Sequence, residues 1–328
     1  MMYYVKKIIA LIATLLLVTM LSFFAFSVIP GDAAAIKLGT EASPEQLEAL
    51  REEMGLNENV AVRYVKWLGG VFHGDFGKSS YYSKPVSELM SEKLPVTMLL
   101  SLLALILIVL IFIPLSVLMM VKENGLFDRI VMLLSRIMMA VPAFFLGLVI
   151  ILVFGFGLKI FTVGGYVAPG EDFAGFLGFM IFPALAIAIP KGTQTLVFLR
   201  SNIIRELRKD YVRTLRASGL SKKRALVHHA LKNAMLPTIT FIGLVAAEVL
   251  AGSVIVEQVF GIPGLGKLLV HSVTARDYNV TQAIVLYIGT VVVLINFTVD
   301  MLYRFFDPTV RVSGGKVKAD KESRQEAQ

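Results

Sequence analysis

Long apolar runs alternate with polar segments along this chain of 328 residues. A helix that crosses the hydrocarbon core of a bilayer needs about 20 mostly apolar residues, and six runs of the sequence meet this length. The pattern therefore predicts an all-α, polytopic membrane protein with six spanning helices. The predicted spans are residues 8–29, 96–121, 137–158, 174–198, 234–256 and 281–303.

The first run also raises the alternative of a cleaved signal peptide, because Lys6 and Lys7 precede it and three alanines follow it at 33–35. The apolar core of a signal peptide has about 7 to 15 residues, and the run from 8 to 29 is longer. We therefore expect residues 1–30 to form a retained N-terminal spanning helix.

The distribution of Lys and Arg predicts how the spans are oriented. The segment 31–95 holds seven basic and ten acidic residues, whereas the loop from 200 to 232 holds ten basic residues against Glu206 and Asp210. Short loops rich in Lys and Arg stay in the cytoplasm. We therefore expect a multi-pass protein of the cell membrane with an extracytoplasmic segment 31–95, a core of five spans over 96–303, and both termini in the cytoplasm. The polar tail 304–328 is expected to lack a stable fold.

Two short helices are predicted in the outer segment. Ser43 and Gln46 have the spacing of a capping box, in which each side chain satisfies a backbone amide of the first helical turn. A second helix is expected around residues 62–68, with Trp67 suited to the membrane interface.

Composition narrows the chemistry further. The chain has no cysteine and only four histidines, none of them at metal-ligand spacing, so neither a metal site nor a cofactor is expected. A net charge of +8 is compatible with nucleic-acid binding, but the basic residues gather on one predicted side of a membrane. No nucleic-acid partner is therefore expected.

One stretch comes close to a nucleotide-binding loop. Gly261, Gly266 and Lys267 fit the spacing G-x-x-x-x-G-K, but residue 268 is leucine where the loop needs Ser or Thr for Mg²⁺. The stretch is also predicted to lie on the outer side of the membrane. Its glycines are therefore expected to shape a turn.

The segment 202–237 contains the start and stop signals of a helical hairpin. Gly219 suits a left-handed helix end, Ser221 suits the N-cap of the following helix, and Pro237 marks where that helix is expected to give way to the next span. A basic loop that only sets the membrane orientation, or one that holds anionic lipid, would explain the positive charge. Neither would explain the helix start and stop signals.

In this hairpin the chain resembles the integral permease subunits of ABC importers of the dipeptide, oligopeptide and nickel type. The stretch 210–221 fits the form D-Y-V-R-T-x-x-A-x-G-L-S of peptide-type members, although the glutamate of the broader E-A-A pattern is missing. Further similar stretches follow in the expected order. They are 54–79, Pro85-Val86, 94–101, 252–269, 276–278 and 306–308, so that the resemblance covers about residues 3 to 310.

The resemblance implies the ABC type I importer permease fold and a set of partners. The chain would form half of a translocation pore beside a second permease subunit, above two cytosolic ATPases, and would receive peptide from an extracytoplasmic solute-binding lipoprotein. ATP hydrolysis would take place on the separate ATPase subunits. The residues that the resemblance assigns to the ATPase-coupling loop are Asp210, Arg213, Thr214, Ala217, Ser218, Gly219, Leu220, Ser221 and Pro237.

Three charged residues in or beside the predicted spans are candidates for the pore lining. An ionisable group inside a span is costly and usually faces a pore or a partner helix. Glu248 is interpreted either as facing the pore, where it could touch a peptide amino group, or as bonded to a neighbouring helix. Lys191 has the same two alternatives. For Glu257, which precedes the outer loop, a structural role in the turn is favoured over a role in a gate.

Other functions remain as alternatives. The same machinery could carry nickel or another small solute. An intramembrane hydrolase would need a dyad deep in the spans, for which Lys191 with Thr193 or Thr195 is the only faint candidate. A passive channel or scaffold would not need a cytoplasmic helical hairpin with defined helix ends.

Overall fold

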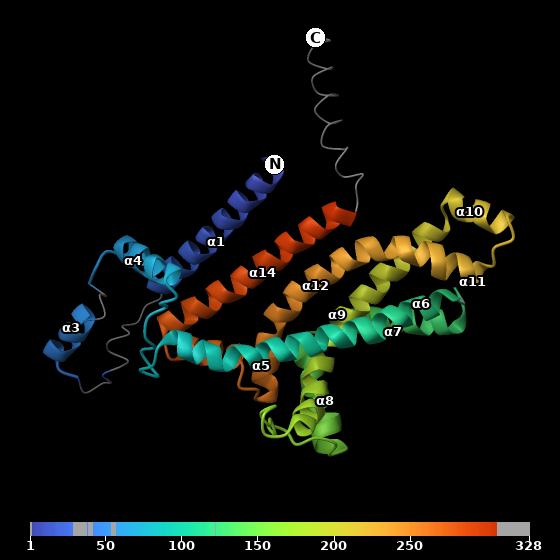
Figure 1. Ribbon diagram of the computed structural model, residues 1–328. Coiled ribbons are helices and arrows are strands. Elements are labelled where there is room, and N and C mark those ends of the chain that lie inside the picture. The colour runs from blue at the N-terminus through green and yellow to red at the C-terminus, as the bar shows by residue number, and fades with distance from the viewer. Residues whose placement is uncertain (1, 29–37, 39–41, 54–56, 122, 307–328) are drawn as a thin grey trace, which may run out of the picture. The chain divides into compact units, whose positions relative to one another are not determined.

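The computed structural model describes residues 2–28, 38, 42–53, 57–121 and 123–306. Over these residues the regular elements are helices (Figure 1). One isolated β-bridge pairs Lys78 with Pro85. The expectation of an all-α protein is therefore confirmed. The elements are α1 (Met2–Val28), α3 (Pro44–Glu53), α4 (Val60–Phe72), α5 (Val86–Leu107), η1 (Ile108–Phe112), α6 (Ile113–Val121), α7 (Leu126–Ala140), α8 (Ala143–Ile150), η2 (Ile151–Gly157), α9 (Phe173–Leu207), α10 (Asp210–Ala217), α11 (Lys222–Ala225), η3 (Leu226–Ala230), α12 (Leu231–Phe260), α13 (Leu265–Thr274) and α14 (Tyr278–Phe306).

Five stretches of helix are long and apolar enough to cross a membrane. They are Val5–Phe26, Val86–Val121, Phe173–Leu207, Lys222–Phe260 and Tyr278–Val299, and they correspond to five of the six predicted spans. The sixth span exists only if α7 and the helix Ala143–Gly157 are counted together. Within the described residues the fold is thus that of a multi-pass membrane protein.

The predicted continuous span 137–158 is wrong, because the helix breaks at Val141 and Pro142. Val141 has φ −83° and ψ 122°, an extended conformation. Proline has no amide hydrogen and disfavours the helical conformation in the residue before it. From the positive charge of Lys122, Arg129 and Arg136, the sequence before the span 137–158 is expected to be a cytoplasmic loop. The structure instead has the helix α7 there.

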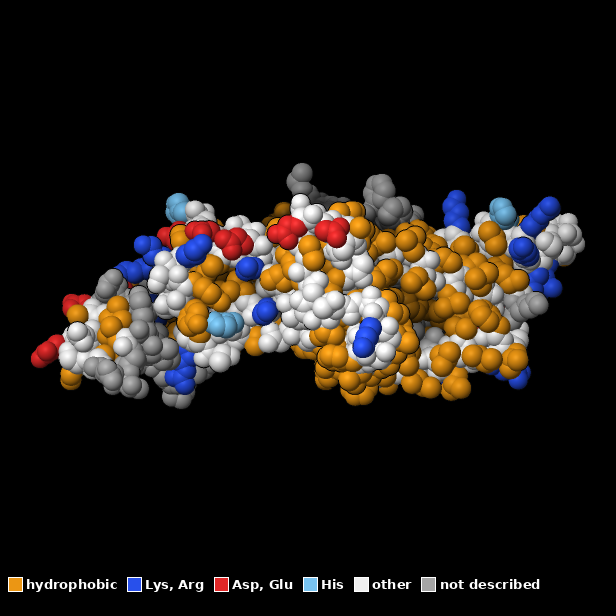
Figure 2. Space-filling view, turned by 90° about the horizontal axis from the view of Figure 1, so that it is seen from below, with side chains coloured by type: hydrophobic (Ala, Val, Ile, Leu, Met, Phe, Trp, Pro, Cys, Tyr) orange, Lys and Arg blue, Asp and Glu red, His pale blue; other side chains and the backbone are white. Residues whose placement is uncertain are grey.

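Helix α7 has an inverted pattern of burial. Its polar residues Asp128 and Ser135 are buried, whereas Leu126 and Leu133 are 76% and 61% exposed. Hydrophobic side chains are likewise exposed over much of the face drawn in Figure 2. A helix of a soluble protein hides its apolar face. The apolar face of α7 is instead exposed, a pattern that suits a lipid environment.

The helices contribute to two compact units, which are described separately. The first unit contains Met1–Ala104, Ala143–Ile187 and Leu250–Val293, and the second contains Leu105–Pro142, Ala188–Val249 and Leu294–Gln328. Because α5, α9, α12 and α14 each have residues in both, a long helix belongs in part to each unit.

In the first unit the outer segment is anchored on α1 and on the start of α14. Thr19 of α1 and Tyr64 of α4 share a hydrogen bond of 2.9 Å between their hydroxyl groups. At the start of α14 the buried carboxylate of Asp277 accepts a hydrogen bond from Ser79. The first turn of α5 shares a core with α13 and α14 that consists of Val86, Leu89, Met90, Leu265, Leu268, Val280, Ala283 and Ile284.

The predicted outer helices are present as α3 and α4. Ser43 Oγ accepts from the amide of Gln46 at 3.2 Å, and Gln46 Oε1 accepts from the amide of Ser43 at 3.1 Å. The capping box is therefore confirmed. In the sequence, Gly55 suits the left-handed end of this helix, but it lies outside the described residues, as do residues 307–328 of the tail.

In the second unit α9 packs against α6 and α12 through two buried clusters. One contains Met120, Leu199, Ile203, Leu226 and Ala234, and the other contains Phe112, Met119 and Leu196. Ser116 of α6 also donates to the backbone carbonyl of Leu196 at 3.3 Å. The C-terminal half of α9 is thereby a fixed support for the hairpin that follows it.

Candidate functional site

The α10–α11 hairpin, defined as residues 208–225, follows the end of α9 (Figure 1). Gly219 ends its first arm with φ +94°, a left-handed conformation that favours glycine. The amide of Leu220 donates to the carbonyl of Leu215 at 3.1 Å, which is the bond of a Schellman helix end. Ser221 then caps α11 by accepting from the amide of Arg224 at 3.4 Å. Both predictions for the turn are confirmed.

Most of the residues assigned to the coupling loop are exposed, along the first arm of this hairpin and at its tip. Leu220 is half-buried, and the exposed members are Asp210, Arg213, Thr214, Ala217, Ser218, Gly219 and Ser221. The surface is basic, since exposed Lys222, Lys223 and Arg224 follow it. Such a tip can dock against an acidic or polar partner.

Pro237 does not belong to this surface. The prediction that the second arm gives way to the next span at Pro237 is wrong, because α12 runs without interruption from Leu231 to Phe260. Membrane helices tolerate proline where neighbouring groups satisfy the freed backbone. Pro237 takes the helical amide donor from the carbonyl of Asn233, four residues before it. The adjacent Thr238 hydroxyl donates to the next carbonyl, that of Ala234, at 2.7 Å.

The base of the hairpin is fixed by a chain of side-chain hydrogen bonds. Tyr211 donates from its hydroxyl to Glu206 Oε2 at 3.1 Å and accepts from Asn233 Nδ2 at 3.1 Å. Glu206 also forms an ion pair of 2.6 Å with Lys209. Burial raises the pKa of the Tyr211 phenol, so the hydroxyl stays protonated and can donate. One signal in the sequence pointed to this anchor, since Glu206 is one of only two acids in the loop 200–232, beside ten basic residues.

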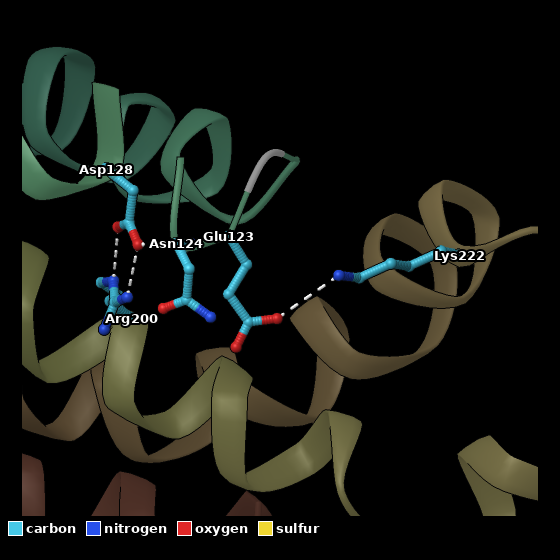
Figure 3. A network of polar contacts seen from close by, with 5 residues as sticks. All are labelled: Glu123, Asn124, Asp128, Arg200 and Lys222. Atoms are coloured by element: carbon cyan, nitrogen blue, oxygen red, sulfur yellow. Dashed lines mark hydrogen bonds and ion pairs between the residues drawn. The ribbon is translucent and has the colours of Figure 1, made fainter. Parts of the chain in front are cut away.

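A second network ties the turn between α6 and α7 to α9 and α11 (Figure 3). Arg200 donates to both carboxylate oxygens of Asp128, at 2.8 and 2.7 Å. Lys222 Nζ lies 3.4 Å from Glu123 Oε2. The α10–α11 hairpin is therefore held at its first arm by Tyr211 and at its second arm by Lys222.

Lys191 and Glu248, which were proposed separately for the pore lining, form an ion pair between α9 and α12. The hydroxyls of Thr193 and Thr195 donate to backbone carbonyls of their own helix, including that of Lys191 at 3.0 Å. The lysine is thus paired with a carboxylate, and the threonine hydroxyls are bonded to the backbone. These contacts do not form the dyad of a hydrolase.

Glu257 has a different environment, in the first unit. Its side chain is fully buried, and its Oε2 accepts from the amide of Gly266 at 2.7 Å. A Cβ at Gly264 would collide with the same carboxylate, and a Cβ at Gly266 would collide with the backbone of Val254. These contacts support the structural role that was favoured for Glu257.

The same contacts explain the near-match to a nucleotide-binding loop. In such loops backbone amides at a helix N-terminus bind phosphate. Here the amide of Gly266, in the first turn of α13, is taken by the carboxylate of Glu257. Gly261, with φ +73°, provides the turn that returns the chain to this carboxylate.

Comparisons with known proteins agree with this arrangement. Residues 112–312 match the family described as binding-protein-dependent transport system inner membrane component, and residues 1–102 match the N-terminal region of such membrane components. The chain is 38% identical over 311 residues to the oligopeptide transport system permease protein AppB of Bacillus subtilis, covering 94% of this chain and 98% of the relative. It is 36% identical over 309 residues to the glutathione transport system permease protein GsiC of Salmonella paratyphi A, with the same coverage. The chain belongs to the family of inner membrane components of binding-protein-dependent transport systems.

Proposed function

We propose that this chain is a permease subunit of an ATP-driven importer and forms half of the path through which short peptides cross the cell membrane. The named relatives serve oligopeptide and glutathione transport systems, and glutathione is itself a tripeptide. Both names favour a peptide over nickel as the cargo. A second permease subunit would complete the path.

We further propose that the α10–α11 hairpin couples the chain to a cytosolic ATPase. The observation that carries this proposal is the contrast between its exposed tip and its fixed base. The tip exposes Arg213, Ser218 and Gly219 to a partner, while hydrogen bonds of Tyr211 and Asn233 join its base to α9 and α12. A rigid element with a free end can transmit a movement of the ATPase to the spans.

The remaining partners follow from the proposed orientation. The excess of basic residues in the loop 200–232 supports a cytoplasmic hairpin and cytoplasmic termini. Two ATPase subunits would then lie on that side. The outer segment 31–95 and the loop around Gly264 would face a solute-binding lipoprotein on the other side.

Cysteine labelling tests this orientation directly, because the chain has no cysteine of its own. A Ser218→Cys variant carries one thiol at the exposed hairpin tip, and Ser87→Cys carries one at an exposed position in the outer segment. We expect a membrane-impermeant maleimide to label residue 218 in inverted vesicles only and residue 87 in intact spheroplasts only. A bismaleimide should also link residue 218 to a copurified ATPase subunit with an engineered surface cysteine in its docking groove. Labelling of residue 218 from outside would refute the proposal.

A further inference from the structure

The ion pair between Lys191 and Glu248 lies where charge is least expected. Lys191 is close to the middle of α9 and Glu248 is in the middle third of α12, both of which are candidate spans. A lone ionised group at this depth is expensive, and pairing lowers the cost. The pair is therefore stable at membrane depth in a way that neither residue would be alone.

Two packing contacts near the pair hold α9 in place, one against α12 and one against η1. The rings of Phe198 and Phe241 stack at 4.3 Å, seven residues from Lys191 along α9 and seven from Glu248 along α12. Gly192 faces the ring of Phe112 so closely that a Cβ there would overlap it. The two helices are thus held side by side, and the charged groups have little freedom to move apart.

The pair is nevertheless open on one side. The side chain of Glu248 is 55% exposed, whereas that of Lys191 is 28% exposed. Leu244, one turn before Glu248, is exposed as well. A carboxylate offered directly to lipid would be costly, so this face of α12 is better suited to a polar passage than to the bilayer.

The carboxylate also has unused capacity for hydrogen bonds. A carboxylate has about four acceptor sites, and among the contacts of the described residues Glu248 accepts only from Lys191. Lys191 is the less exposed partner, and its ammonium balances the charge of the carboxylate. What remains available at the exposed edge is an acceptor for a cation.

We infer that Glu248 is a recognition point for the amino-terminal ammonium of the transported peptide, with Lys191 as the residue that positions its carboxylate. The inference rests on the proposed function, since it assumes that a peptide passes this face. The ligand class is a cation because the more exposed partner of the pair is the acid. An ammonium donor would form a charge-assisted hydrogen bond with the free edge of the carboxylate.

The test compares two probes in the complete transporter, reconstituted with its ATPases and binding protein. Trialanine has a free amino terminus with a pKa of about 7.7 to 8.0, so it is charged at about pH 6.5, and N-acetyltrialanine lacks this charge. The measured quantity is the ratio of kcat/KM for uptake of the two probes. Because the binding protein is the same in every sample, its own preference cancels when variants are compared.

We expect Glu248→Gln to lower this ratio by about tenfold or more, which corresponds to the loss of one hydrogen bond to a charged group. The double variant Lys191→Glu with Glu248→Lys keeps an ion pair but exposes an ammonium, so it should reach the membrane and lose the preference for trialanine. The control Glu88→Gln removes one partner of the exposed Lys84–Glu88 pair, 2.6 Å apart in the outer segment. It should leave the ratio unchanged.

An equal loss of uptake for both probes in Glu248→Gln, or no loss, would overturn the inference and leave a purely structural ion pair. Retention of the trialanine preference by the double variant would overturn it too. If the wild-type transporter takes up neither probe when ATP is present, the proposed function fails and the inference fails with it. The wild-type sample thus separates the two failures.

Discussion

Asp128 and Arg200 are joined by two parallel hydrogen bonds of 2.8 and 2.7 Å, and Asp128 also accepts from the amide of Asn124 at 2.9 Å. Asn124 has a left-handed φ of +64°, so the carboxylate stabilises an otherwise unfavourable turn between α6 and α7. This turn places Glu123 beside Lys222 of the α10–α11 hairpin.

Asp128→Asn should therefore destabilise the protein strongly. Removal of one partner of a buried ion pair costs about 3–5 kcal/mol, because the other charge is left without compensation. Thermal unfolding of the protein in detergent should show a clear drop in Tm. The exposed pair Lys66–Glu58 provides the control, and Glu58→Gln should change the stability by no more than about 1 kcal/mol. Equal Tm values for Asp128→Asn and Glu58→Gln would contradict this role of the pair.

Tyr211→Phe should loosen the base of the hairpin. The phenol bridges Glu206 and Asn233, and its loss leaves a nearly buried carboxylate with one donor fewer, at a cost of about 1–3 kcal/mol. We expect faster proteolysis within residues 208–225 and slower ATP-driven uptake. Tyr81→Phe, at a ring that is mostly exposed, should change neither. A proteolysis pattern in Tyr211→Phe identical to that of the wild type would count against the anchor.

Gly264→Ala should disrupt the outer loop, because the added methyl group would collide with the buried carboxylate of Glu257. Gly252→Ala is the matched control, since a Cβ there meets nothing within 4 Å and the residue lies inside α12. In a helix, alanine is favoured over glycine by about 0.5–1 kcal/mol. The yield of folded protein after detergent extraction should fall for Gly264→Ala and stay level or rise for Gly252→Ala. A normal yield of Gly264→Ala would mean that the loop is not held by Glu257.

The features predicted correctly from the sequence are those that depend on a few neighbouring residues. The capping box of Ser43 and Gln46, the left-handed end at Gly219 and the N-cap at Ser221 each act within one helical turn. The length of an apolar run likewise identified five of the six predicted spans without knowledge of their neighbours. These local signals were sufficient for the fold class and for the α10–α11 hairpin.

The features that were missed depend on contacts between distant segments or on competing signals. Pro142 ends a helix while Pro237 lies inside one, so proline alone does not decide a boundary. Helix α7 was expected as a cytoplasmic loop because Lys122, Arg129 and Arg136 lie in this stretch, a charge signal that competes with its helical pattern. The pairing of Lys191 with Glu248 depends on the relative register of α9 and α12, which neither stretch of sequence contains.

ATP-driven peptide uptake by Gly219 variants tests the central claim, that the α10–α11 hairpin transmits the work of an ATPase. Gly219 has φ +94° and open space around its missing side chain, so a substitution there acts through the backbone. A left-handed conformation costs most residues about 1–2 kcal/mol, and asparagine tolerates it better than a β-branched residue does. The control Gly178→Val replaces a glycine of α9 that also has open space, but no positive φ. The account predicts that uptake is lost in Gly219→Val, is largely kept in Gly219→Asn and is unchanged in Gly178→Val, with all three proteins inserted in the membrane. Full uptake by Gly219→Val would contradict it.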